Sequence, residues 1–231
     1  MLALVAASVA FIHTLSGPDH YLPFIAMARA SRWSMGKAAR VTLLCGLGHV
    51  ASSVFLGLVG IAAVFGVDRL IAVESFRADV AAWGMIGFGL VYMVWGLRKA
   101  VRNRSHEHWH AHVDGTVHRH LHVHASEHLH AHATEAKPRL TPWILFTIFL
   151  FGPCEPMIPI LMYPALEHSR IGVVIVTLVF ATVTLATMLG IVLSVLLGAR
   201  RVRSGFAERY SHALAGGAVL ACGVAMKFFG L

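Results

Sequence analysis

The chain has 231 residues, of which 57% are hydrophobic and only 13% are Asp, Glu, Lys or Arg, and its formal net charge is +8. A soluble domain carries roughly 25% charged residues, and a disordered chain is poor in apolar residues, so this composition excludes both classes. The bases lie in short clusters between apolar runs, a pattern typical of membrane topology. We therefore expect an integral protein of the lipid bilayer with no nucleic-acid partner.

Apolar segments long enough to cross a bilayer, about 20 residues each, predict six transmembrane helices. In chain order they are expected over residues 2–30, 38–66, 80–97, 142–166, 171–199 and 210–231. The first segment lacks the basic start and the cleavage site of a signal peptide, so we expect it to be retained as a helix. The sequence thus predicts an all-α membrane protein.

The distribution of the basic residues predicts the orientation. Fifteen of the 19 Lys and Arg residues fall in three loops, at residues 29–40, 98–139 and 200–209. The positive-inside rule places these loops in the cytoplasm, and with six spans both termini then lie outside. We expect a multi-pass protein of the plasma membrane, the inner membrane of the cell, with a long cytoplasmic loop between its third and fourth spans.

Two of the predicted spans carry matching breaks, Gly-Pro-Asp-His at 17–20 and Gly-Pro-Cys-Glu-Pro at 152–156. Each break opens a set of three spans, which predicts a 3+3 inverted repeat over 1–99 and 141–231 around a cytosolic His-rich loop, 100–140. Proline leaves backbone groups unpaired, and these must face protein or water inside a bilayer. Two matched breaks indicate one central site near the midplane, whereas the alternative is that the prolines are packing kinks.

Ionisable residues at the breaks predict what this site binds. Asp19 and Glu155 are the only carboxylates expected deep in a span, with no Lys or Arg in mid-span to pair with them. A charge at the bilayer centre costs at least about 2.5–3.5 kcal/mol, so such residues usually serve a cation, a proton or a base. Imidazole, carboxylate and thiolate together are ligands for zinc, nickel, cobalt or ferrous iron. The predicted intramembrane metal ligands are His13, Asp19, His20, His49, Cys154 and Glu155.

Three of these interpretations have simpler alternatives. A lone histidine inside a membrane, such as His49, is often a hydrogen-bonded core residue. Cys45 lies one helical turn before His49 and is a weaker candidate ligand, because a lone thiol on a helix is usually a small packing residue. Cys222 has no polar neighbours in sequence and is interpreted as packing.

The predicted cytosolic loop contains 11 of the 16 histidines, at every second position in three runs. They are His106, His108, His110, His112, His118, His120, His122, His124, His128, His130 and His132. Period two and the Asp114-Gly115 turn signal favour a small β-ribbon with an imidazole face that metal binding orders. The alternatives are a disordered tract that buffers metal and a pH sensor. Dense imidazole makes all eleven candidate ligands for a divalent metal.

The first-half motifs, His13 with Asp19-His20 and Leu47-Gly48-His49, resemble those of the nickel/cobalt transporter (NicO-type) family, within the LysE-like six-span superfamily. The His-rich loop and Pro153-Cys154 resemble the efflux branch of that family. The resemblance implies transport of a divalent metal, with His13, Asp19, His20 and His49 as the metal-handling positions.

Together these features predict a carrier that is not an enzyme and has no organic cofactor. Its cargo is expected to be a divalent transition metal, with nickel or cobalt favoured and zinc or iron next. The chain has no GxxxxGK[ST] nucleotide-binding motif, so we expect proton-coupled efflux driven by a gradient. The alternative is a thiol–disulfide electron carrier of the cytochrome c biogenesis type, but that needs a cysteine in each half, and Asp19 stands where Cys154 has its first-half match. The sequence leaves a homo-oligomer open.

Overall fold

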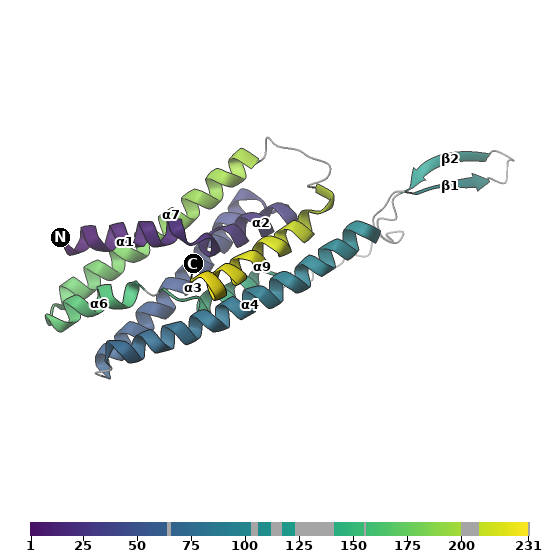
Figure 1. The fold of residues 1–231 in the computed structure, drawn as a ribbon. Coiled ribbons are helices and arrows are strands. Elements are labelled where there is room, and N and C mark those ends of the chain that lie inside the picture. The colour runs from purple at the N-terminus through teal and green to yellow at the C-terminus, as the bar shows by residue number, and fades with distance from the viewer. Residues whose placement is uncertain are drawn as a thin grey trace, which may run out of the picture.

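The computed structural model describes residues 1–63, 66–102, 106–111, 117–122, 141–154, 156–199 and 208–230, with backbone alone for 106–111 and 117–122. These residues form an elongated bundle of helices and one pair of short strands (Figure 1). The helices are α1 (Leu2–Ser16), the 3₁₀ turn η1 (Pro18–His20), α2 (Leu22–Ala30), α3 (Met35–Ala62), α4 (Val67–Arg102), α5 (Thr141–Phe151), α6 (Met157–Leu166), α7 (Arg170–Ala199) and α9 (Ser211–Phe229).

Four of the described helices, α3, α4, α7 and α9, are long and apolar enough to cross a membrane. A fifth span results if α1 and the segment Pro18–Ala30, which are bent by 84° at their junction, are counted as one broken span. The shorter helices α5 and α6 are also apolar. The prediction of a helical multi-pass membrane protein is confirmed at this level, with four to five candidate spans.

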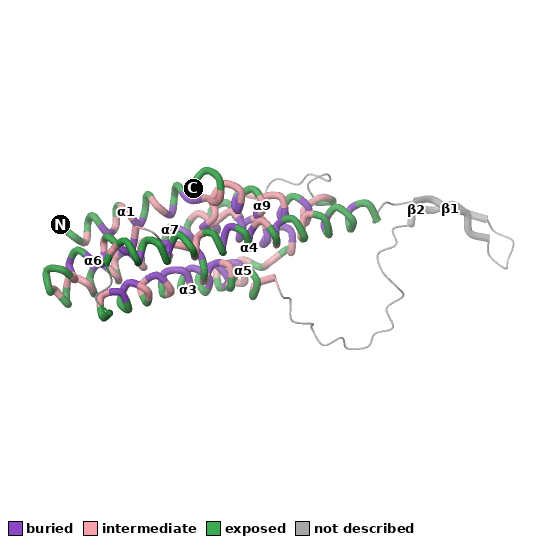
Figure 2. The backbone as a smooth tube through the Cα atoms, turned by 60° about the horizontal axis from the view of Figure 1, so that its bottom comes forward, coloured by how far each residue is buried: buried purple, intermediate pink, exposed green. Residues whose placement is uncertain are grey.

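Large apolar side chains point outward along these helices. Phe55, Val91 and Leu178 are 70%, 70% and 61% exposed, and exposed residues run along the outer sides of α1, α3 and α4 (Figure 2). In water such surfaces mark interaction sites, whereas in a bilayer the lipid tails cover them. The apolar exterior therefore supports membrane insertion.

Both breaks predicted from the sequence are present. Helix α1 ends at Gly17, whose N–H donates to the His13 carbonyl at 3.0 Å, and Pro18 then opens η1. The second break separates Phe151, the last residue of α5, from Met157, the first residue of α6. Proline has no N–H and cannot continue the preceding helix, so each Gly-Pro pair ends a helix in the middle of an apolar segment.

The third predicted span is longer than expected. It was predicted over residues 80–97, but α4 runs from Val67 to Arg102 and contains the buried residue Glu74. Glu74 accepts a hydrogen bond from Arg77 at 2.6 Å in the same helix, and the Arg77 side chain is only 12% exposed. The span predicted at 80–97 therefore leaves out Glu74 and Arg77, which α4 contains as an ion pair. A hydropathy pattern counts Glu74 and Arg77 as two charges, whereas the fold buries them as a pair.

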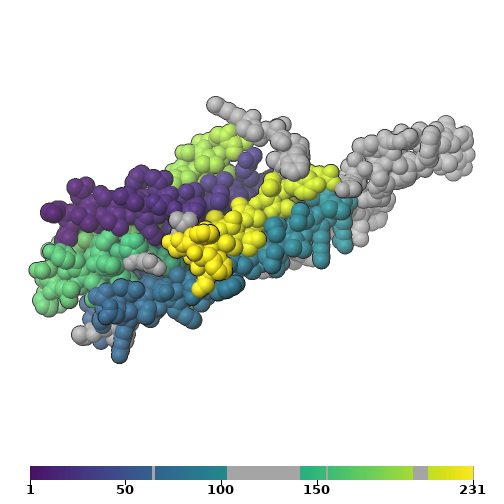
Figure 3. All heavy atoms as spheres, in the orientation of Figure 1, coloured from purple at the N-terminus to yellow at the C-terminus, as the bar shows by residue number. Residues whose placement is uncertain are grey.

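Helices α4 and α9 pack closely along most of the length of α9. Each carries two glycines seven residues apart, Gly89 and Gly96 on α4 and Gly216 and Gly223 on α9. A Cβ atom at any of the four would lie within 3.0 Å of backbone atoms of the other helix. Small residues at this spacing allow the backbone contact through which membrane helices associate. Figure 3 shows α9 in yellow lying along α4, with its end at mid-length of the bundle near α1.

The His-rich segment contains the two strands. Strand β1 (His106–Ala111) pairs antiparallel with β2 (Val117–His122), and three cross-strand pairs are both histidines: His106 with His122, His108 with His120, and His110 with His118. The β-ribbon interpretation is confirmed for these residues. The predicted turn at 114–115 and the candidate ligands His112, His124, His128, His130 and His132 lie outside the described residues.

Candidate metal centre

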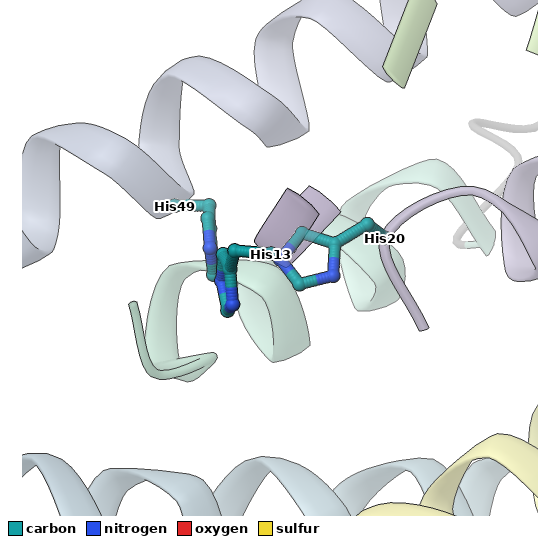
Figure 4. A group of neighbouring side chains, drawn as sticks. All are labelled: His13, His20 and His49. Carbon is teal, nitrogen blue, oxygen red and sulfur yellow. The ribbon is translucent and has the colours of Figure 1, made fainter. Parts of the chain in front are cut away.

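Three histidines from separate elements converge at the first helix break. His13 lies in the last turn of α1, His20 ends η1, and His49 lies at mid-length of α3. Each offers one ring nitrogen, and these atoms all lie within 4.8 Å of one another (Figure 4). The His20 ring is the middle one, with its centroid 4.7 Å from that of His13 and 5.1 Å from that of His49, edge to face in both cases.

The geometry of the first break orients the His20 ring. Its Nδ1 lies 3.1 Å from the Gly17 carbonyl and 3.2 Å from Oδ1 of Asp19. Both neighbours are acceptors, so Nδ1 carries the proton and donates, which leaves a lone pair on Nε2 in the neutral ring. A carboxylate that holds one imidazole nitrogen while the other is free is the usual arrangement around a protein metal ligand. Asp19 therefore lies behind His20 and orients its ring.

The ring nitrogens of the three histidines are buried and close enough together to be candidate metal ligands. The Nε2 atoms of His13, His20 and His49 are buried and have no hydrogen-bond partner among the described residues. Three atoms within 4.8 Å of one another lie at most about 2.8 Å from a common centre, because 4.8/√3 ≈ 2.8. Metal–imidazole bonds are about 2.0–2.1 Å long, so each nitrogen would need to move inward by at most about 0.7 Å to bind a common metal.

Two pockets adjoin the histidines. The larger, about 480 Å³, is lined on one side by His13, Asp19 and His20 and on another by Pro153 and Pro156. The second is only about 10 Å³, room for no more than one water, and its lining includes Asp19, His49 and Gly152. The sequence predicted that both breaks would serve one site, and both do border the larger pocket. Asp19 lines both pockets, and each pocket is also lined by at least one of the three histidines.

The described cysteines are not part of this group. Cys154 is fully buried in an apolar cluster with residues such as Ala10 and Phe180, and Cys45 lies in a different cluster that includes Phe24. The group of three ring nitrogens includes neither thiol. Cys45, Cys154 and Cys222 are all free cysteines. Glu155 lies outside the described residues, and the six histidines of β1 and β2 are described by backbone alone.

Two glycines that sequence reasoning did not assign to the site are part of its construction. A Cβ atom at Gly17 would lie 2.6 Å from Nδ1 of His20 and 2.8 Å from Oδ1 of Asp19. A Cβ atom at Gly152 would lie 3.0 Å from Nδ1 of His49. Both glycines are in the motifs that marked the breaks, but only the fold shows that their missing side chains make room for the imidazole rings.

No protein-family model, no curated protein and no solved structure matches the chain. Its chemistry is therefore inferred from its own residues. Three imidazoles with a supporting carboxylate are ligands of the type that borderline divalent cations prefer, and among the described residues the group includes no thiol.

Proposed function

We propose that the protein is a membrane carrier for a divalent transition metal and that His13, His20 and His49 bind this metal during transport. The observation that carries the proposal is the convergence of three buried ring nitrogens from three elements at one helix break. A histidine that only packs in a core finds a hydrogen-bond partner for each polar atom, because an unpaired buried group is costly. Three neighbouring histidines that each have an unpaired, buried Nε2 are better explained as ligands.

The ligand set favours borderline metals. Imidazole suits nickel, cobalt, zinc and ferrous iron, whereas cuprous copper prefers the thiolates and thioethers that are absent from this group of three. Nickel and cobalt remain the favoured cargo through the resemblance of the first-half motifs to the nickel/cobalt transporter family, with zinc and iron next. The metal is the substrate here and no organic cofactor is proposed.

The proposed architecture is six spans in a 3+3 inverted repeat. It counts α1 with α2 as the first span and α5 with α6 as the fourth, so that both broken spans meet at the larger pocket. Broken helices that line a cavity at mid-depth are the usual plan of secondary transporters. We propose that the metal reaches the histidines through the larger pocket. It would leave through the narrow pocket beside His49, which must widen during transport.

The proposed direction is export from the cytoplasm through the plasma membrane. The positive-inside rule puts the His-rich segment in the cytoplasm and both termini outside, so loop histidines such as His108 and His120 capture metal before it enters the bundle. Imidazole must be deprotonated to bind metal, so protons that move in the opposite direction release the metal from His13, His20 and His49. Proton-coupled efflux follows from this exchange.

Metal binding to purified protein tests the proposal. Wild-type protein in detergent is titrated with Ni²⁺, Co²⁺, Zn²⁺ and Fe²⁺ by calorimetry, and the loop is removed so that only the intramembrane site is measured. Each of the variants His13→Asn, His20→Asn and His49→Asn should bind metal at least 10-fold more weakly than wild type, and its transport into proteoliposomes should fall as its affinity falls. His168→Asn is the matched control, because His168 is exposed and its φ of 52° suits Asn. Equal binding by all four variants would contradict the proposal.

A further inference from the structure

Arg77 is a largely buried cation of α4 that contacts two other parts of the bundle. Its Nη1 donates to Oε1 of Glu74 at 2.6 Å and to Oγ of Ser53 at 3.2 Å. Its Nη2 donates to Oγ of Ser52, to the Leu150 carbonyl at 3.0 Å and to the Gly152 carbonyl at 3.4 Å. One guanidinium thus joins α4 to α3 and to the second helix break.

The two carbonyls show what Arg77 does at that break. Helix α5 ends at Phe151, and the last four carbonyls of a helix have no partner within it. Leu150 contributes one of these carbonyls and Gly152 contributes the next one beyond the end. A cation at a helix C-terminus also interacts favourably with the helix dipole. Arg77 therefore caps the C-terminus of α5, where Pro153 prevents the chain from continuing as a helix.

The same guanidinium is linked to His49 by two routes. Ser52 accepts from Arg77 and donates its own hydroxyl to the His49 carbonyl at 2.8 Å, which ties Arg77 to the backbone of the ligand residue. Gly152, whose carbonyl Arg77 holds, lies against the His49 ring, since a Cβ atom there would be 3.0 Å from Nδ1. Arg77 therefore acts on both the backbone and the ring position of His49 without touching the ring.

We propose that Arg77 is a positioning residue of the metal site, which fixes the second helix break against His49 so that its ring nitrogen stays within ligand distance of His13 and His20. This rests on the proposed metal-binding function. An arginine is needed because the two terminal nitrogens of its planar guanidinium reach Glu74, both serines and both carbonyls, whereas a lysine has three donors at one point. Ionisable residues inside membrane proteins are usually retained for function, since they are costly to insert.

The role predicts a change at the metal, beyond any loss of stability. Arg77→Met keeps the length of the side chain and removes its donors, so the second break moves away from His49. Loss of the partners that orient metal ligands commonly lowers metal affinity by about 10–100-fold. Arg77→Lys keeps the charge but not the fork, and Ser52→Ala removes only the link to the His49 carbonyl, so both should give intermediate losses.

The test measures Co²⁺ affinity and the visible absorption of bound Co²⁺, which reports ligand number and geometry, in wild-type and variant proteins purified in detergent. The matched control is Lys227→Met, which breaks another ion pair of α4, that between Lys227 and Asp79, where the Asp79 side chain is 53% exposed. We expect Arg77→Met to shift the spectrum and lower the affinity at least 10-fold, with Lys227→Met unchanged. If Arg77→Met does not fold, Arg77→Lys and Ser52→Ala decide the question by the same two readouts.

The outcomes separate this inference from the proposed function. If wild-type protein binds metal and His49→Asn loses it, while the Arg77 and Ser52 variants keep the wild-type spectrum and affinity, the positioning role is wrong and the metal site stands. If these variants lose thermal stability alone, Arg77 is structural only, which also overturns the inference. If neither wild type nor His49→Asn binds metal, the proposed function itself fails.

Discussion

Gly17→Ala is the sharpest perturbation of the proposed site, because it adds one methyl group beside the most constrained ligand. The new Cβ atom would lie 2.6 Å from Nδ1 of His20, where ordinary contact begins at 3.4 Å, so the ring must retreat by about 0.8 Å. It would also lie 2.8 Å from Oδ1 of Asp19, so the carboxylate that orients the ring moves as well. The φ of Gly17 is −91°, a value that alanine adopts freely, so backbone strain contributes nothing.

The expected result is a loss of metal affinity with the fold intact. Displacing one ligand and its orienting carboxylate should weaken Ni²⁺ or Co²⁺ binding by about 10–100-fold, or about 1.4–2.7 kcal/mol, measured by calorimetry on detergent-purified protein. Gly87→Ala and Gly190→Ala are the controls, since a Cβ atom there meets nothing within 4 Å. They should keep wild-type affinity and gain about 0.4–1 kcal/mol of stability. Wild-type affinity in Gly17→Ala would refute the assignment of His20 as a ligand.

Four further outcomes are expected. Asp19→Asn removes the charge that holds Nδ1 of His20 and should lower metal affinity by at least about 10-fold in the same titration. Deleting residues 106–132 should lower the apparent affinity for transport in proteoliposomes but leave residual transport, because the intramembrane site is separate. In cysteine labelling, the thiol of Gly115→Cys should be reachable only from the cytoplasm. The thiol of Gly66→Cys, at the exposed start of α4, should be reachable only from outside. Gly216→Leu should prevent α4 and α9 from packing and abolish recovery of folded protein in detergent, because its side chain would enter the backbone of α4.

The features that the sequence predicted correctly are local ones. A Gly-Pro pair inside an apolar run ends a helix wherever the run folds, so the breaks after Ser16 and Phe151 follow from the chain alone. Period-two histidines and the Asp-Gly signal likewise predict the ribbon of β1 and β2. His20 was assigned to the site because an ionisable residue beside such a break is costly without a ligand.

The features that the sequence could not predict depend on how helices are rotated against one another. The sequence left Cys45, one turn before His49, open as a weak ligand candidate or a packing residue; it packs in an apolar cluster, while His49 meets His13 and His20. Asp19 was predicted as a direct ligand, but the turn at Gly17 brings its carboxylate against Nδ1 of His20. Arg77 lies between the spans predicted at 38–66 and 80–97, and nothing local shows that the Leu150 carbonyl, 73 residues away in sequence, accepts its hydrogen bond.

The two breaks therefore make different contributions to one site, although their sequences match. The first supplies chemistry, since η1 places a ligand, His20, and the carboxylate that orients it, Asp19. The second supplies shape, since Gly152 leaves room for the His49 ring and its carbonyl is held by Arg77. A Gly-Pro sequence is needed in both places for the same two reasons: proline frees backbone groups, and glycine lets a side chain from another element approach. In the proposed carrier the ligands therefore gather at the first break, and Arg77 keeps the second break against His49 while metal is bound.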